Sequence, residues 1–275
     1  MNEPEYILDE RDGAVAVLTL NRPEARNAQN IPLLEQLDAA FCGAAADPAI
    51  KVIVLKANGP HFSAGHDIAP ENNALFASRV DLDAGASDFY AWEHEHYLCM
   101  TRRWRDLPKP TIAAVQGKCI AGGLMLCWPC DLIIAAEGAE FSDPVVRMGV
   151  GGVEYHAHTW ELGPRRAKEL LFTAQPVTAE EALRLGMVNR VVPPEDLEKE
   201  TLELARRIAQ MDGFALRMAK QAVNRTLDTM GQWTAMQAVF DMHHLAHCQS
   251  RMVHAGSAIS EMDVAKMKRD PQEPG

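Results

Sequence analysis

The sequence lacks any apolar run that approaches the roughly 20 residues of a membrane-spanning helix. Its first residues, MNEPEYILDE, are acidic and have no apolar signal core, so we expect no export. Six cysteines in 275 residues are too few for a disulfide-stabilised scaffold. These absences predict a cytoplasmic protein that has no membrane partner.

Positive charge is also scarce, because 27 Lys and Arg stand against 38 Asp and Glu, for a formal net charge of −11. This balance disfavours nucleic acid and anionic membranes as general partners, although a local basic pocket for an anionic ligand is compatible with it. Hydrophobic residues (47%) and charged residues (24%) are in the range of folded globular proteins, which excludes a disordered chain.

Strand and helix patterns alternate along most of the chain, which predicts a parallel sheet with right-handed crossovers. The expected domains are an α/β core over residues 1–190 and a helical region over 191–275. Residues 69–87 show no clear period and are expected to form a loop. The expected strands are 6–10, 14–20, 50–57, 111–116 and 131–136, and the expected helices are 31–46, 88–105, 124–128, 165–172, 178–186, 195–210 and 214–248.

The last of these helices carries apolar residues at helical spacing. An ordinary core face is one interpretation of this stripe. The other is burial against a second subunit, as in a homo-oligomer. The stripe consists of Trp233, Met236, Val239, Phe240, Met242 and Leu245.

Two glycine-containing turns each follow a buried strand. The first is FSAGHDI at 62–68, and the second is GKCIAGG at 117–123, which opens a helix. A helix start leaves backbone N–H groups without intrahelical partners, and small residues let a ligand approach them. On adjacent strands, two such turns would aim two N–H groups at one oxygen, which is the geometry of an oxyanion hole.

Other site patterns are absent or incomplete. The second turn lacks the G-x-G-x-x-G spacing of a dinucleotide site, and no phosphate-binding G-x-x-x-x-G-K-[ST] motif occurs. Ser63 has His61 where a nucleophile elbow requires glycine. His243 and His247 lie one helical turn apart, but no H-E-x-x-H motif supplies an acidic ligand, so this spacing predicts no metal site.

Cys127 and Cys130 match the C-x-x-C pattern of redox proteins. A redox pair opens a helix, whereas this pair closes a predicted helix and precedes a strand. Two buried core thiols are therefore the favoured interpretation. The redox hypothesis predicts a thiol of low pKa and a reversible disulfide.

Five sequence blocks occur in an order that resembles the crotonase superfamily, the enoyl-CoA hydratases and isomerases. The resemblance covers residues 5–265 and implies a crotonase-like α/β fold of repeated ββα units. It also implies an acyl-CoA substrate, no separate cofactor, and a C-terminal helical region that builds a trimer or a dimer of trimers. The blocks are NRPEARNA at 21–28, FSAGHDI at 62–68, KPTIAAVQGKCIAGG at 109–123, CDLIIAA at 130–136 and FTAQPVTAEEALRLGMVNRVV at 172–192.

By this resemblance, the oxyanion hole falls on the backbone N–H groups of His66 and Gly122. A bound CoA thioester reconciles an acidic chain with an anionic substrate, since only Arg22, Arg26 and Lys56 need to gather locally. The residues that the resemblance assigns to CoA binding are Ala25, Arg26, Ala64, Gly65, Asp67 and Ile68.

The chain departs from the hydratase pattern at both acid–base positions. The two glutamates that hold and activate water in hydratases of this family correspond to Met125 and Val145. Neither side chain transfers protons, so the standard two-glutamate hydration is excluded. A replacement is expected in the segment after Phe141, where we predict Glu154 first, and His156 or Asp143 next.

The leading hypothesis is an acyl-CoA enzyme that stabilises a thioester enolate without the usual glutamates. Decarboxylation, C–C bond hydrolysis, isomerisation and residual hydration stay open. The FSAGHDI turn and the later blocks are also similar to methylmalonyl-CoA decarboxylase. The alternative from another class is a non-catalytic acyl-CoA binding protein that kept the pocket.

Overall fold

The computed structural model describes residues 4–81, 85–254 and 257–259. Its central sheet has six strands in the order β1-β2-β3-β4-β6-β9, antiparallel between β1 and β2 and parallel from β2 onward. The predicted parallel sheet is therefore confirmed. The strands are β1 Ile7–Asp12, β2 Val15–Leu20, β3 Val52–Ala57, β4 Thr111–Val115, β6 Leu132–Ala136 and β9 Arg190–Val192.

A second, smaller sheet contains β5 Lys118–Ile120, β7 Glu140–Ser142 and β8 Val177–Thr178. Each of its first two strands directly follows a strand of the central sheet: β5 follows β4, and β7 follows β6. An isolated bridge between Ser63 and Cys119 extends the same arrangement to the chain after β3. This alternation between two sheets is the expected repeat of ββα units.

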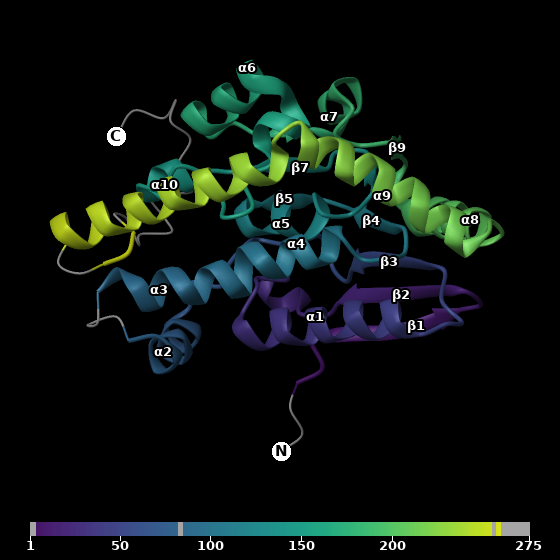
Figure 1. The fold of residues 1–275 in the computed structure, drawn as a ribbon, viewed down its shortest axis with the longest axis horizontal. Coiled ribbons are helices and arrows are strands. Elements are labelled where there is room, and N and C mark those ends of the chain that lie inside the picture. Colours follow the sequence, from purple (N-terminus) through teal and green to yellow (C-terminus); the bar gives the residue numbers. More distant parts are fainter. Residues whose placement is uncertain (1–3, 82–84, 255–256, 260–275) are drawn as a thin grey trace.

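The helices cover the sheets on both sides (Figure 1). In the central sheet, Val15 and Val17 face one side and pack with Ala205 of α8, while Ala16 and Leu18 face the other side and join the larger core cluster. The helices are α1 Ile31–Ala46, α2 Pro70–Arg79, α3 Ala86–Glu93, α4 Met100–Arg105, α5 Leu124–Cys127, α6 His158–Thr173, α7 Ala179–Leu185, α8 Leu197–Ala209, α9 Gly213–Thr229 and α10 Gln232–Val253. Among the described residues, no helix combines the length and apolar character that crossing a membrane requires.

The expected loop over residues 69–87 is wrong for residues 70–79, which form α2. The helix buries none of its residues, so the sequence shows no apolar period there. Local contacts fix its start instead: the Asp67 carboxylate accepts a hydrogen bond from the Ala69 N–H at 2.9 Å. Phe76 then packs edge-on against Trp92, which attaches α2 to the neighbouring helix.

The single helix expected over 214–248 is also wrong, because the chain breaks between α9 and α10. Gly231 has φ of +97°, a left-handed conformation that glycine adopts without steric cost. The break lets α10, yellow-green in Figure 1, cross the molecule toward α3. There the ring of Phe89 packs against His244 and His247.

The apolar stripe of the last helix divides between the two interpretations. Met236 and Phe240 are buried in the core of this chain. Met242 and Leu245 remain 66% and 69% exposed. The same helix therefore serves as a core element and presents apolar side chains on its outer face.

The buried position of Cys127 and Cys130 contradicts the redox hypothesis. Burial raises the pKa of both thiols, which is the opposite of what a redox cysteine requires. Cys127 Sγ also lies 3.8 Å from Cys119 Sγ, within the same core. All six cysteines are free thiols.

We expect a thiol reagent to label at most three cysteines in the native protein and six after denaturation. Cys42, Cys99 and Cys248 are half-buried, whereas Cys119, Cys127 and Cys130 are buried. Mass spectrometry of the labelled peptides gives the count and the positions. Rapid native labelling of Cys127 or Cys130 would contradict the prediction.

Candidate active site

The two glycine-containing turns lie against each other at the ends of β3 and β4. The Ile120 N–H donates to the Ser63 carbonyl at 3.0 Å, next to the Ser63–Cys119 bridge. Gly65 has φ of +90°, and a Cβ there would lie 2.7 Å from the Ile120 oxygen. Only glycine permits this approach, so the predicted pairing of the turns is confirmed.

The approach brings the backbone nitrogens of His66 and Gly122 close together. A Cβ built on Gly122 would lie 3.1 Å from the His66 nitrogen and 2.9 Å from Gln29 Oε1. Gly122 lies in the 3₁₀ turn Ala121–Gly123 that precedes α5, where an N–H has no partner one turn earlier in the helix. The geometry thus gathers two backbone donors of the kind that stabilise an oxyanion.

Beside these nitrogens is a cavity of about 300 Å³, within the size range of small-molecule sites. His66 lines one side of the cavity, and side chains of α3 and α10 also line it. Its apolar lining includes Ile68, Phe76, Phe89, Tyr97, Val145, Met148, Val150 and Val153. Its ionisable lining includes His66, Asp67, Glu93, Glu154, His243 and His247.

Glu154 lies at the centre of this ionisable lining. Its Oε2 is 3.1 Å from His66 Nε2, and its Oε1 is 3.5 Å from His243 Nε2. The His66 ring also stacks on Tyr97, with ring centroids 4.4 Å apart. One carboxylate thus joins the turn after β3 to α10 across the cavity.

The charges in this cluster stabilise one another. Burial alone would raise the pKa of Glu154, but the positive charges of His66 and His243 outweigh it and lower that pKa. Burial likewise opposes protonation of His243, yet Glu154 and Glu93 raise its pKa to about 9. Glu154 is therefore an anion that is paired with the His243 imidazolium at neutral pH.

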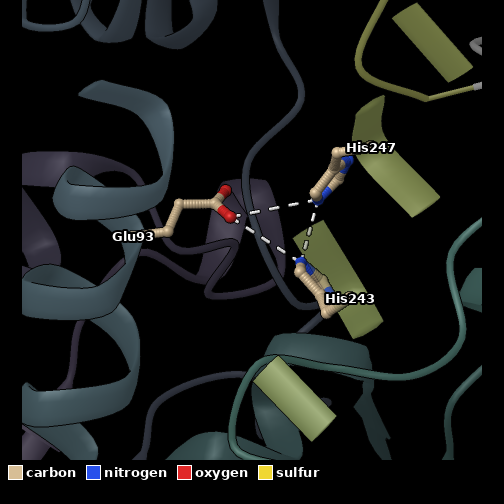
Figure 2. Close-up of side chains that lie close together, drawn as sticks. All are labelled: Glu93, His243 and His247. Carbon is tan, nitrogen blue, oxygen red and sulfur yellow. Dashed lines mark hydrogen bonds and ion pairs between the residues drawn. The ribbon is translucent and has the colours of Figure 1, made fainter. Parts of the chain in front are cut away.

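Three further ionisable side chains meet where α3 approaches α10. Figure 2 shows Glu93, the last residue of α3, facing His243 and His247 on consecutive turns of α10. The residues are buried, and the three ligand atoms lie within 4.8 Å of one another. An acidic side chain therefore lies beside the two histidines although the sequence has no H-E-x-x-H motif, because Glu93 comes from another helix.

Of the three predicted acid–base residues, Glu154 lines the cavity, and Asp143 and His156 do not. Asp143 Oδ2 accepts from the Val153 N–H at 2.9 Å and from His158 Nε2 at 2.8 Å, and both carboxylate and ring are fully enclosed. These bonds hold the loop that carries Glu154. Burial lowers the pKa of His156 to about 4, so that imidazole is neutral at pH 7.

The residues assigned to CoA binding lie in two adjacent segments. The Ala64 N–H donates to the Arg26 carbonyl at 3.0 Å, and a parallel bridge joins Gln29 to His66. Asp67 forms an ion pair with Arg22 at 2.6 Å. The two segments thus lie side by side, and the Arg22 guanidinium is paired with Asp67. Of the predicted CoA-binding residues, Asp67 and Ile68 line the cavity, and Ala25, Arg26, Ala64 and Gly65 do not.

The positions of the missing hydratase glutamates are apolar in the folded chain as well. Met125 is buried in the core cluster, and Val145 contributes an apolar surface to the cavity. Sequence spacing did not predict Glu93 or His243 as cavity residues. The one signal available was the pair of histidines four residues apart, which a helix places on one face.

Replacing Asp143 tests its supporting role. We expect Asp143→Ala to lower the free energy of unfolding by at least ~2 kcal/mol, because two buried donors lose their acceptor. Asp88→Ala, at an exposed position, is the control and is expected to stay within ~0.5 kcal/mol of wild type. Urea denaturation measures both variants. Equal stabilities would contradict the assignment.

Comparison with known proteins places these features in one family. The family model of enoyl-CoA hydratase/isomerase matches residues 10–258. A probable enoyl-CoA hydratase from Mycobacterium smegmatis has a crystal structure with a TM-score of 0.85 and 56% identity, covering 92% of this chain and 98% of that chain.

EchA13 of Mycobacterium tuberculosis, whose name refers to enoyl-CoA hydratase, is 42% identical over 92% of this chain and 84% of its own. The crotonyl-CoA hydratase of Syntrophomonas wolfei is 36% identical over 82% of this chain and 84% of its own. The model match and these identities confirm the resemblance read from the motifs: the chain belongs to the enoyl-CoA hydratase/isomerase family.

Proposed function

We propose that this protein binds an enoyl-CoA thioester and moves a proton at the carbon chain next to the thioester carbonyl. The carbonyl oxygen lies between the N–H groups of His66 and Gly122, and Glu154 carries the proton. The observation that supports this most is the buried Glu154 carboxylate in the cavity wall, joined to His66 at 3.1 Å.

A single carboxylate is sufficient for the isomerisation of a carbon–carbon double bond. Glu154 removes a proton from one carbon, and the electron pair moves to the thioester oxygen as an enolate. Two backbone donors stabilise that oxyanion, and each is worth roughly 10²–10³ in rate. The protonated carboxyl then returns its proton to another carbon of the chain, and the double bond has shifted.

Hydration is the second candidate, and Glu93 favours it. His243 Nε2 lies 3.7 Å from Glu93 and 3.5 Å from Glu154, so two carboxylates face the same imidazole. Such a pair can position water even though Met125 and Val145 cannot. The names of the relatives also refer to hydratases. Decarboxylation, by contrast, stays a prediction from sequence similarity alone.

The acyl group is expected to be mainly apolar. Phe76, Phe89 and Tyr97 supply aromatic surface, and Val145 occupies a position where a hydratase has a carboxylate. Apolar lining with a few convergent polar groups is the usual composition of a small-molecule site. The charged residues then face the reacting end of the substrate, near His66 and Glu154.

Glu154→Gln tests the proton carrier. We expect kcat to fall at least ~100-fold, because a positioned general acid or base contributes that much, while thioester binding persists. Glu137→Gln, at an exposed position, is the matched control and should retain full activity. Mass spectrometry of products from 2-enoyl- and 3-enoyl-CoA in D₂O separates isomerisation from hydration, and calorimetry measures binding.

The outcomes of this experiment are distinct. Full activity of Glu154→Gln would place the proton carrier elsewhere. A wild-type protein that binds thioesters and converts none of them would establish the binding-protein alternative. Addition of water to 2-enoyl-CoA without double-bond migration would select hydration over isomerisation.

We also propose that the exposed apolar side chains of α9 and α10 contact other copies of the chain, as a trimer or a dimer of trimers. Val223 and Leu245 are 61% and 69% exposed, and Phe214, Met230 and Met242 of the same region are exposed as well. Several large apolar side chains exposed together indicate a contact surface. Sedimentation at micromolar concentration is expected to give three or six times 30.3 kDa. Leu245→Glu should weaken assembly, whereas Gln175→Glu, at an exposed position outside α9 and α10, should not. A stable wild-type monomer would contradict the proposal.

A further inference from the structure

Helix geometry places His243 and His247 on one face of α10, one turn apart, where both rings point toward Glu93 on α3 (Figure 2). The two Nε2 atoms lie 2.9 Å apart. Glu93 Oε2 lies 3.7 Å from His243 Nε2 and 3.9 Å from His247 Nε2. Three ligand atoms thus converge from two helices that are about 150 residues apart in the sequence.

These separations match the dimensions of a metal site. A point equidistant from the three atoms lies about 2.1 Å from each of them, by the geometry of their triangle. Zinc–imidazole bonds are about 2.0–2.1 Å long, and zinc–carboxylate bonds about 2.0–2.2 Å. That point lies in the plane of the three atoms, so a tetrahedral ion would be reached by small rotations of the side chains, with both helices in place.

The Nδ1 atoms of the two rings are already hydrogen-bonded to backbone carbonyls. His243 Nδ1 lies 2.9 Å from the Gly152 carbonyl, and His247 Nδ1 lies 2.6 Å from the Ala258 carbonyl. A carbonyl only accepts, so each Nδ1 carries a hydrogen, and loss of the proton on Nε2 leaves a lone pair there for a metal ion. Backbone carbonyls that fix this tautomer are the usual support of metal-binding histidines.

The 2.9 Å contact between the two Nε2 atoms is a hydrogen bond that protonated His243 donates to His247. A cation bound here would take the place of that proton. Glu93 Oε2 is buried, with His244 Nε2 at 3.1 Å and the Nε2 atoms of His243 and His247 at 3.7 and 3.9 Å. Nearby Glu154 adds a second negative charge, with its Oε1 3.5 Å from His243 Nε2.

We propose that Glu93, His243 and His247 bind one divalent transition-metal ion of the first row in the wall of the cavity. Two imidazoles and one carboxylate form the ligand set of a class of catalytic zinc sites, and they also suit Fe²⁺. The hard cations Mg²⁺ and Ca²⁺ prefer oxygen ligands and are disfavoured. This proposal revises the absence of a metal predicted from sequence spacing.

His244 has a different part in this cluster. Its Nε2 lies 3.1 Å from Glu93 Oε2, but its ring is not among the three groups whose ligand atoms converge. The ring packs against Phe89 and Tyr90, which hold it beside the carboxylate. His244 is thus placed to orient Glu93.

The protein is first stripped with a chelator, and then titrated with ZnCl₂ by calorimetry. Metal analysis after gel filtration gives the stoichiometry. We expect one Zn²⁺ per chain, and an affinity at least ~100-fold lower for Glu93→Gln and for His247→Ala, since loss of even an outer support costs 10–100-fold. His254→Ala removes an exposed histidine from the end of the same helix and should change nothing. MgCl₂ in place of ZnCl₂ should give no binding.

A spectroscopic measurement on the wild-type protein covers the case in which a variant fails to fold. Co²⁺ should give the visible absorption of a site with few ligands, and Zn²⁺ should displace it. Absence of stoichiometric Zn²⁺ binding by the wild-type chain, or equal affinity in folded Glu93→Gln and His247→Ala variants, would overturn the proposal. In that case the contact between His243 and His247 is a hydrogen bond and binds no metal ion.

These measurements use no acyl-CoA. The metal site and the proposed proton transfer therefore succeed or fail independently.

Discussion

The contact between the turn after β3 and the turn after β5 is the constraint on which the rest of the site depends. Gly65 and Gly122 permit it, because a side chain at either position would collide with the opposite turn. The contact sets the distance between the His66 and Gly122 nitrogens. It also aims the His66 side chain across the cavity at Glu154. Two backbone donors and one side chain thus take their positions from a single close approach.

The second constraint is electrostatic. Glu93, Glu154, His66, His243 and His247 are drawn from the turn after β3, from α3, from the loop after β7 and from α10. Burial of any one of these charges alone would be costly, so each is stable only beside the others. The Asp143–His158 pair lies behind this cluster and fixes the loop that carries Glu154. The cluster therefore requires the whole fold around it.

The arrangement shows how the backbone framework of the cavity and its ionisable side chains can have separate origins in the chain. The two backbone N–H groups depend on strand ends and glycines. The ionisable side chains come from Glu154 and from α3 and α10, whereas positions 125 and 145 are apolar. Loop and helix residues exchange more freely than the sheet that positions them.

The sequence by itself determined the alternation of strands and helices and the two glycine turns, because these follow from local periodicity and from motifs of a few residues. Glu154 was predicted from the family resemblance instead, and the structure places it in the cavity wall. The sequence did not determine α2, whose exposed surface leaves no apolar period, nor the break at Gly231. Only the tertiary structure assigned Asp143 to support and brought Glu93 to His243 and His247. Those contacts depend on where α3 and α10 cross, and the spacing of residues along the chain does not predict that crossing.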